Sequence, residues 1–250
     1  MQIRFMTFNI QHGIDYLKQK AKGPHDDDSQ DEVDLKLMAS VVREQQADII
    51  ALNEVRGRGV SPGYTAQAEE LAALLGYHCY FACALEFEGK NPYGNAILSR
   101  FPLQTAETVA IPDPPVQDED AYYETRCVLR ARFAKAGGFT VLVSHFGLAK
   151  SEQRNAVKTI TKLLEQEKKP VILMGDFNME PDDPILSPLF EQMTDTAAVF
   201  ESAQKSWPSD APEMKIDYIL VRGAKTLQAE IPPVTASDHR PHVALLELQD

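Results

Sequence analysis

The sequence contains only three cysteines, Cys79, Cys83 and Cys127, among its 250 residues. This odd number, in apolar or strand-like segments, argues against a disulfide framework and favours reduced, buried thiols. No apolar run approaches the roughly 18 residues that a membrane-spanning helix needs. Met1 leads directly into a strand-like segment, without the charged region and apolar core of a signal peptide. We therefore expect a cytoplasmic protein.

Basic residues are also scarce. The 25 lysines and arginines face 37 aspartates and glutamates, which gives a formal net charge of −12 and a pI near 5.0. A protein that neutralises many phosphates usually carries a basic stripe, whereas the largest charge run here, residues 25–32, is acidic. Indiscriminate nucleic-acid binding is therefore disfavoured, although a locally positive cleft stays compatible with this charge. We interpret the acidic run as a solvated loop, since it lacks the glycine of a calcium-binding loop.

Apolar periodicity alternates between strand and helix along the chain, with no long linker or repeat. Helices are predicted at 33–46, 65–76 and about 152–167, with Gly76 ending the second and Ser151 capping the third. Strands are predicted at 1–10, 48–54, 79–85, 95–99, 126–133, 137–146, 171–178, 215–221 and 242–249, with a hairpin turn at residues 137–138. This α/β pattern predicts a sheet-rich sandwich with helices on the outside.

Polar residues stand at the ends of several predicted strands, each after an apolar run. They are Asn9, Glu54, His145, Asp176, Asn178 and Asp217, and the last segment begins with Asp238 and His239. Sites collect at strand ends because a rigid sheet aims side chains into a shared cleft. Side chains alternate along a strand, so Asp176 and Asn178 point to the same side.

The chemistry of these residue types narrows the function. Glu54, Asp176, Asp217 and Asp238 would repel one another if gathered without a cation. A hard divalent ion such as Mg²⁺ takes oxygen ligands, often only one or two of them carboxylates. Histidine and asparagine can hydrogen-bond phosphate oxygens, and histidine can hold a proton near neutral pH. Together these groups are the parts of a hydrolase that transfers phosphoryl groups.

The motifs TFNIQHG, ALNEV, GNAILSR, SHFGL, GDFN, KIDYILV and SDHRPH follow one another from Thr7 to His242. In this order the sequence resembles the endonuclease/exonuclease/phosphatase superfamily over nearly its whole length. The resemblance implies a four-layer α/β/β/α sandwich of two packed, mostly antiparallel sheets with outer helices. It also implies a single catalytic domain over residues 1–250.

The same resemblance implies a metal site. Glu54 corresponds to the glutamate that binds Mg²⁺ directly, and Mn²⁺ is expected to substitute. Asn9 corresponds to the first-strand asparagine that helps to orient the metal site. Asp238 lies where the family has a further carboxylate on the metal side. The family's usual glutamine before the metal glutamate is Asn53 here, a shortening by one methylene that should be tolerated.

Catalytic roles are implied in the same way. Asp176 resembles the aspartate that orients or deprotonates the attacking water, and Asn178 the asparagine that holds phosphate. Asp217 resembles the carboxylate that fixes the imidazole of His239. His145 resembles the histidine that donates to the phosphate or the leaving group.

Three further residues are candidate substrate contacts, each with a structural alternative. His12 can reach the cleft or make a loop hydrogen bond, and Arg126 can bind phosphate or pair with a strand neighbour. Asn95, in GNAILSR, matches a family position that lines the site. The segment 203–212, with Trp207, is expected to form a loop at the cleft mouth.

The resulting expectation is a Mg²⁺-dependent phosphohydrolase in which water attacks phosphorus in line. Its partner is a phosphoester, more a small or headgroup-type diester or monoester than duplex DNA, and we expect a monomer without a membrane span. A nuclease is the alternative, supported if Lys150, Arg154 and either Arg56 or Arg58 line one rim of the cleft. A catalytically silent phosphate-binding module and a purely structural ion site are the remaining alternatives.

Overall fold

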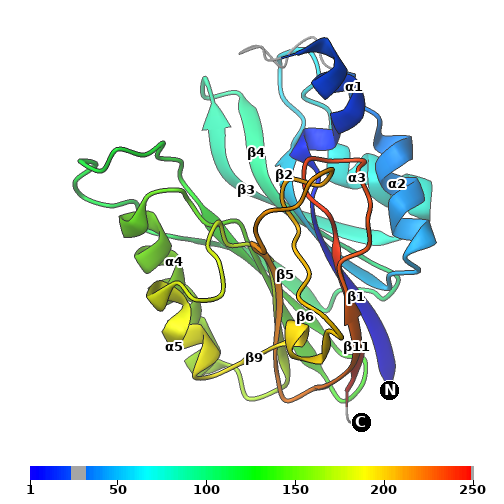
Figure 1. Cartoon of the computed structure of the whole chain (residues 1–250), viewed down its shortest axis with the longest axis vertical. Helices are drawn as coiled ribbons and strands as arrows, with labels where there is room; N and C mark the ends of the chain where they lie inside the picture. Colours follow the sequence, from blue (N-terminus) through cyan, green and yellow to red (C-terminus); the bar gives the residue numbers. More distant parts are fainter. Residues whose placement is uncertain (24–31, 249–250) are drawn as a thin grey trace.

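The computed structural model describes residues 1–23 and 32–248, and its strands form two six-stranded sheets that pack face to face. The first sheet has the order β11-β12-β1-β2-β4-β3 and the second the order β5-β6-β7-β8-β10-β9. The pairs β1–β2 and β7–β8 are parallel, and the other neighbours pair antiparallel. Helices α2 and α3 cover the outside of the first sheet, and α4 and α5 cover the second (Figure 1). This confirms the predicted four-layer sandwich.

The elements have the following bounds. The first sheet contains β1 Gln2–Asn9, β2 Ile49–Arg56, β3 His78–Phe87, β4 Asn91–Ser99, β11 Lys225–Glu230 and β12 His242–Glu247. The second contains β5 Thr105–Ala110, β6 Cys127–Phe133, β7 Phe139–Ser144, β8 Val171–Asp176, β9 Thr194–Asp195 and β10 Asp217–Arg222. The helices are α1 Tyr16–Lys22, α2 Leu35–Glu44, α3 Gln67–Leu75, α4 Lys150–Gln166 and α5 Ser187–Phe190, with 3₁₀ turns η1 Gln11–Gly13, η3 Pro184–Leu186 and η4 Thr196–Val199.

The predicted helices and strands are present, and five further ones in the described residues escaped prediction: α1, α5, β5, β9 and β11. Strands β5 and β11 are half-exposed edge strands without an apolar run, β9 has two residues, and α1 buries no side chain. The predicted cap at Ser151 is wrong: α4 begins at Lys150, and the Glu152 carboxylate accepts from the backbone N–H of Ala149 at 3.4 Å. The acidic run lies outside the described residues except for Glu32. No described helix is long and apolar enough to cross a membrane.

Strands β1 and β8 carry apolar side chains on both of their faces, because each lies between two layers of the fold. In β1, Ile3 and Phe5 point into the core between the sheets, whereas Met6 and Phe8 pack under α2 and α3. In β8 the same alternation sends Ile172 and Met174 inward and Val171 and Leu173 against α4. Because side chains alternate between the two faces of a strand, the two sheets form three apolar layers: one between the sheets, one under α2 and α3, and one under α4 and α5.

The pairing directions bring the predicted polar residues to one edge. Because β1 and β2 run parallel, Asn9 lies beside Asn53. The parallel pair β7–β8 ends in the same way, which places His145 next to Asp176. Strand β10 runs the other way, so its first residue, Asp217, pairs with Asp176 at the end of β8. Strand ends from both sheets thus meet at one place.

Gly175 allows β8 to reach this edge, and its replacement tests the packing. Its φ is +148°, and a Cβ there would lie 1.8 Å from the carbonyl oxygen of Ser144 in β7. We expect Gly175→Ala to lower the free energy of unfolding by about 3 kcal/mol, from backbone strain and overpacking together. Gly76→Ala is the control, because a Cβ at that left-handed position meets nothing within 4 Å; there we expect only about 1 kcal/mol. Equal shifts in urea midpoint would contradict this account.

Candidate active site

A cavity of about 440 Å³ opens at the edge where the strand ends meet. Seven of the predicted site residues line it: Glu54, Arg126, His145, Asp176, Asn178, Asp238 and His239. Trp207 also lines it, as expected for the loop at the mouth. Leu148, Met214 and Ile216 complete the lining and were not predicted, although Ile216 lies within the KIDY motif and Met214 directly precedes it.

Glu54 reaches the cavity through a bulge in β2. The register between β2 and β4 shifts between Leu52 and Val55, and Glu54 has a φ of +57°, in the left-handed region. Such a bulge re-aims one side chain out of the alternating pattern. The Glu54 Oε1 atom accepts a hydrogen bond from Asn9 Nδ2 at 2.9 Å. The same nitrogen donates to Asp176 Oδ2 at 3.1 Å, so Asn9 lies behind the cavity and links two carboxylates.

Asp176 is held from several sides. Its backbone N–H donates to Asn53 Oδ1 at 2.9 Å, and its Oδ1 accepts from the backbone N–H of Asn178 at 2.9 Å. Asn178 has a φ of +51°, a conformation that asparagine tolerates better than most residues. Burial raises the pKa of Asp176 to about 7. A carboxylate with such a pKa is suited to general-base work at neutral pH.

His239 lies between two carboxylates. Its Nδ1 is 2.9 Å from Asp217 Oδ2, and its Nε2 is 3.6 Å from Asp176 Oδ2. Burial by itself lowers the pKa of His239, but the charges of Asp217, Asp176 and Asp238 together raise it well above the usual range. The geometry therefore favours a protonated imidazole that faces Asp176.

His145 also lies beside Asp176, but its electrostatic surroundings are the opposite of those of His239. Its Nε2 is 3.4 Å from Asp176 Oδ2, and its Nδ1 is 3.0 Å from a guanidinium nitrogen of Arg126. Burial, the Arg126 charge and the His239 charge all lower the pKa of His145 well below its usual range. A neutral imidazole results, in contrast to His239.

Arg126 determines which nitrogen of His145 carries the proton. Asn178 Nδ2, which donates to the Phe146 carbonyl at 2.9 Å, also lies 3.1 Å from His145 Nε2, so donors face both ring nitrogens. A neutral imidazole accepts at only one nitrogen, and the charged guanidinium is the stronger donor. His145 Nδ1 therefore accepts from Arg126, and Nε2 carries a proton. Arg126 itself is paired with Glu124 at 2.5 Å.

Two predicted substrate contacts lie away from the cavity lining. Asn95 is buried and its amide is used within the protein: its Oδ1 accepts from Asn53 Nδ2 at 2.7 Å and its Nδ2 donates to the Cys127 carbonyl at 3.2 Å. It thus supports Asn53, which holds Asp176. His12 is buried with Nδ1 3.9 Å from Glu54 Oε2, so it contacts the site through Glu54.

The basic residues proposed for a nucleic-acid rim do not appear among the described residues that line the cavity. Lys150 pairs with Asp183 at 2.7 Å, and Arg154 lies 3.8 Å from Glu119. Arg56 is buried, with its guanidinium 4.8 Å from the centre of the Tyr64 ring. Arg58 does not line the cavity either, so the lining gives the nuclease alternative no support.

The donor set fits a hard divalent cation. Glu54, Asp176 and Asp238 present carboxylates to the cavity. Burial raises the pKa of Asp238, the His239 charge lowers it and the Glu54 charge raises it, with burial the largest effect, so the carboxylates lie close enough to repel each other. Asp176, Asp217 and His239 also bring ligand atoms within 4.8 Å of one another, but Asp217 Oδ2 and His239 Nδ1 already bond each other. The oxygens facing the cavity are thus the better fit.

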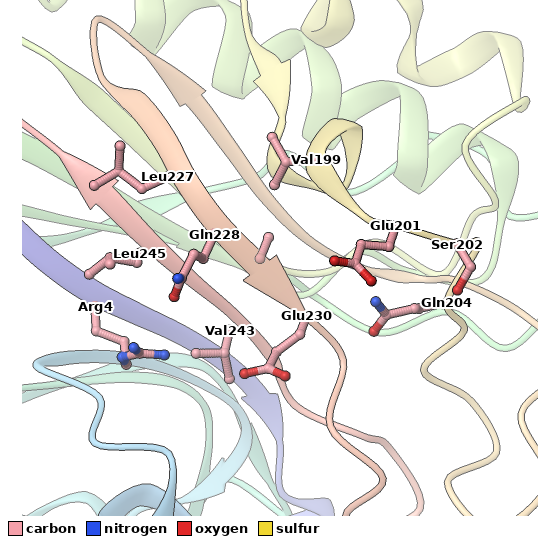
Figure 2. Close-up of a pocket in the computed structure, with 11 residues that line it drawn as sticks. Arg4, Val199, Glu201, Ser202, Gln204, Leu227, Gln228, Glu230, Val243 and Leu245 are labelled. Atoms are coloured by element: carbon pink, nitrogen blue, oxygen red, sulfur yellow. The ribbon is translucent and has the colours of Figure 1, made fainter.

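A separate cavity of about 500 Å³ lies on the outer side of the first sheet (Figure 2). Arg4, Gln228 and Leu245 extend into it from β1, β11 and β12, and Glu201 and Gln204 face them from the segment after η4. Arg4 precedes Asn9 by five residues, or roughly 16 Å of strand. None of the predicted catalytic or metal residues lines this cavity.

Comparison with known proteins gives one family and a set of similar structures. The family model described as the endonuclease/exonuclease/phosphatase family matches residues 6–239. An endonuclease/exonuclease/phosphatase from Beutenbergia cavernae is 24% identical, with a TM-score of 0.75 over 99% of this chain and 72% of that one. A search of curated proteins gave no match.

Two more distant structures carry names that describe an activity or a bound ion. A mannosyl-6-phosphatase from Bacteroides thetaiotaomicron is 17% identical, with a TM-score of 0.75 over 98% of this chain and 99% of that one. The human Nocturnin catalytic domain with bound sulfate is 15% identical, with a TM-score of 0.69 over 99% of this chain and 95% of that one. At these identities the likeness concerns the fold.

The family match over residues 6–239, together with a cavity lined by histidines and carboxylates, identifies the class of protein as a phosphoric ester hydrolase. With the family model covering nearly all of its length, the chain belongs to the endonuclease/exonuclease/phosphatase family.

The opposite surroundings of the two histidines are directly testable. In ¹⁵N-labelled protein at pH 7, long-range ¹H–¹⁵N spectra should show His145 neutral with its proton on Nε2, because Arg126 faces Nδ1. The His239 ring in the same spectrum serves as the internal control and should carry protons on both nitrogens. A proton on Nδ1 of His145 would rule out the contact with Arg126 as described.

Proposed function

We propose that the protein is a Mg²⁺-dependent phosphohydrolase that cleaves a small or headgroup-type phosphoester by in-line attack of water. One observation carries the proposal: Asp176 Oδ2 lies 3.4 Å from His145 Nε2 and 3.6 Å from His239 Nε2, within one cavity. In this arrangement the carboxylate of Asp176 can act as the base, the neutral His145 as a hydrogen-bond donor and the protonated His239 as the acid. A purely structural ion site would not need this division of roles.

The chain's own residues divide the work. Asp176 accepts the proton of the attacking water, because burial raises its pKa to about 7. His145 Nε2–H and the Asn178 amide donate to phosphate oxygens. His239, held at Nδ1 by Asp217, donates its Nε2 proton to the leaving oxygen as the bond between that oxygen and phosphorus breaks. Asn9 keeps Glu54 and Asp176 at a fixed separation through its two hydrogen bonds.

Glu54 and Asp238 would hold the Mg²⁺ ion at the cavity, with Asn9 orienting Glu54. When bound there, the ion supplies positive charge that offsets negative charge on the transferring phosphoryl group. Mn²⁺ is expected to replace it, since both accept carboxylate and water oxygens in octahedral geometry.

The cavity walls support a small substrate. Leu148, Trp207, Met214 and Ile216 contribute an apolar part of the wall beside the histidines and carboxylates. Such a wall suits the organic part of a monoester or a small diester better than a polyanionic backbone. The Bacteroides mannosyl-6-phosphatase of similar fold lends support to a monoester. A nuclease remains the second candidate at the level of the family, without support from the residues around the cavity.

A silent binding module is less consistent with the site, because Glu54, Asp176, Asp217 and His239 are all kept. Other properties also remain proposals. Cys79, Cys83 and Cys127 are free, which supports a reducing compartment such as the cytoplasm. The continuous core between the sheets supports a single domain over residues 1–250, and we propose a monomer.

Hydrolysis of model esters tests the proposal. Bis-p-nitrophenyl phosphate and p-nitrophenyl phosphate are compared with Mg²⁺, with Mn²⁺ and with EDTA. We expect metal-dependent release that falls by a factor of ~10² or more in Asp176→Asn and in His239→Ala, because each removes a positioned proton-transfer group. Asp182→Asn, an exposed carboxylate outside the cavity, should match wild type. Turnover that survives in His239→Ala would defeat the mechanism.

Metal dependence tests the role of Glu54. Glu54→Gln removes the charge and keeps the shape, so the half-saturating Mg²⁺ concentration should rise by ~10-fold or more. Glu70→Gln provides the matched control, since Glu70 is exposed on α3 away from the cavity. Titration of turnover against Mg²⁺ measures both. Superimposable curves for Glu54→Gln and wild type would remove Glu54 from the metal site.

A further inference from the structure

Side chains hold the backbone of Asp217 on both sides. Its N–H donates to Ser206 Oγ at 3.3 Å. Its carbonyl oxygen lies 3.2 Å from His242 Nδ1 and accepts from Lys215 Nζ at 3.4 Å. Ser206 and His242 are fully buried and Lys215 nearly so. These contacts lie behind the cavity, since none of the three residues lines it.

The contacts of His242 fix its tautomer. A carbonyl oxygen can only accept, so the hydrogen of the 3.2 Å contact belongs to Nδ1. Burial lowers the pKa of His242 to about 4, so the ring is neutral at pH 7 and Nε2 keeps a lone pair. That lone pair accepts from the Thr196 hydroxyl at 3.0 Å. Thr196 thus orients the ring that donates to Asp217.

His242 connects the two sheets at this point. It begins β12 and pairs with Thr7 in the first sheet, whereas Asp217 begins β10 in the second. On the same side, the Lys215 ammonium is paired with Asp195 at 2.9 Å and lies 3.5 Å from the centre of the Tyr218 ring. The carbonyl of Asp217 is therefore held by one neutral and one charged donor.

This support matters because the Asp217 carboxylate has few contacts of its own. Oδ2 bonds His239 Nδ1, while Oδ1 is buried without a hydrogen-bond partner among the described residues. One hydrogen bond and the position of the backbone therefore set the direction of the carboxylate. Any shift of that backbone would carry the ring of His239 away from Asp176.

We propose that His242, oriented by Thr196, is a positioning residue that holds the Asp217 carbonyl and thereby aims His239 at Asp176. Lys215 assists as the second donor to the same carbonyl. The inference rests on the proposed function for its effect on turnover, but the hydrogen bonds themselves can be tested apart from activity. The proposed role of His242 involves only hydrogen bonds between residues of this chain.

The tautomer of His242 is the first test and needs no variant. Long-range ¹H–¹⁵N spectra of the wild-type protein, without metal, should show His242 neutral with its proton on Nδ1. A proton on Nε2 would overturn the inference, because Nδ1 could then not donate to the carbonyl.

Two substitutions separate positioning from packing. The amide nitrogen of His242→Asn can take the place of Nδ1 as donor, whereas His242→Leu fills space without a donor. Both lose the contact with Thr196. We expect kcat to fall about 10- to 100-fold in His242→Leu with KM nearly unchanged, and to stay within a few-fold of wild type in His242→Asn. The His239 Nδ1 proton signal should weaken only in His242→Leu.

Equal losses of kcat in both variants would overturn the inference, because they would reflect packing alone. Should His242→Leu fail to fold, Thr196→Val beside Thr196→Ser asks the same question, since only serine keeps the hydroxyl that orients His242. A wild-type protein without activity on any phosphoester would defeat the proposed function instead. In that case the spectra still decide whether His242 holds Asp217 and His239.

Discussion

The concentration of negative charge at one sheet edge is the constraint on which the rest of the structure depends. Glu54, Asp176, Asp217 and Asp238 meet there in a chain that is already strongly acidic. Their nearest basic neighbours are committed elsewhere, Arg126 to Glu124 and Lys215 to Asp195. A protonated His239 offsets part of the repulsion. What is left is the charge that a divalent ion would balance.

The charged neighbours of His145 and His239 give the two rings different protonation states within the same cavity. Burial lowers the pKa of both rings, but the Arg126 charge lowers that of His145 further, whereas the charges of Asp217, Asp176 and Asp238 raise that of His239. The two rings then face one oxygen of Asp176 with different protonation states. The contrast between the two pKa values therefore comes from the charged groups that the fold places around each ring.

The sequence was sufficient for the layers and for most of the cavity. Long apolar runs such as 171–174 predict buried strands, and polar residues directly after them predict an edge with chemistry. The runs could not reveal β5 and β11, because a half-exposed edge strand needs no continuous apolar pattern. The sequence also could not show that Asn95 is absent from the cavity lining. Its amide is used by Asn53 and Cys127, and such partners arise only from pairing across strands distant in sequence.

The contacts through which His242 holds the Asp217 backbone could not be predicted either, because they also join residues that are distant in sequence. His242 and Thr196 read as ordinary strand and loop residues, and only the packing of one sheet on the other joins them. These two residues matter because they set the direction of the Asp217 backbone carbonyl. No residue type or spacing encodes that direction.

The cavity straddles the seam between the sheets, with Glu54 contributed by one sheet and His145 and Asp176 by the other. A ligand that contacts both walls therefore acts as a clamp on the sandwich itself. Its binding energy adds to the cohesion of the two halves and opposes their separation during unfolding. Resistance to heat or protease thus becomes a way to recognise ligands, even those that the enzyme does not transform.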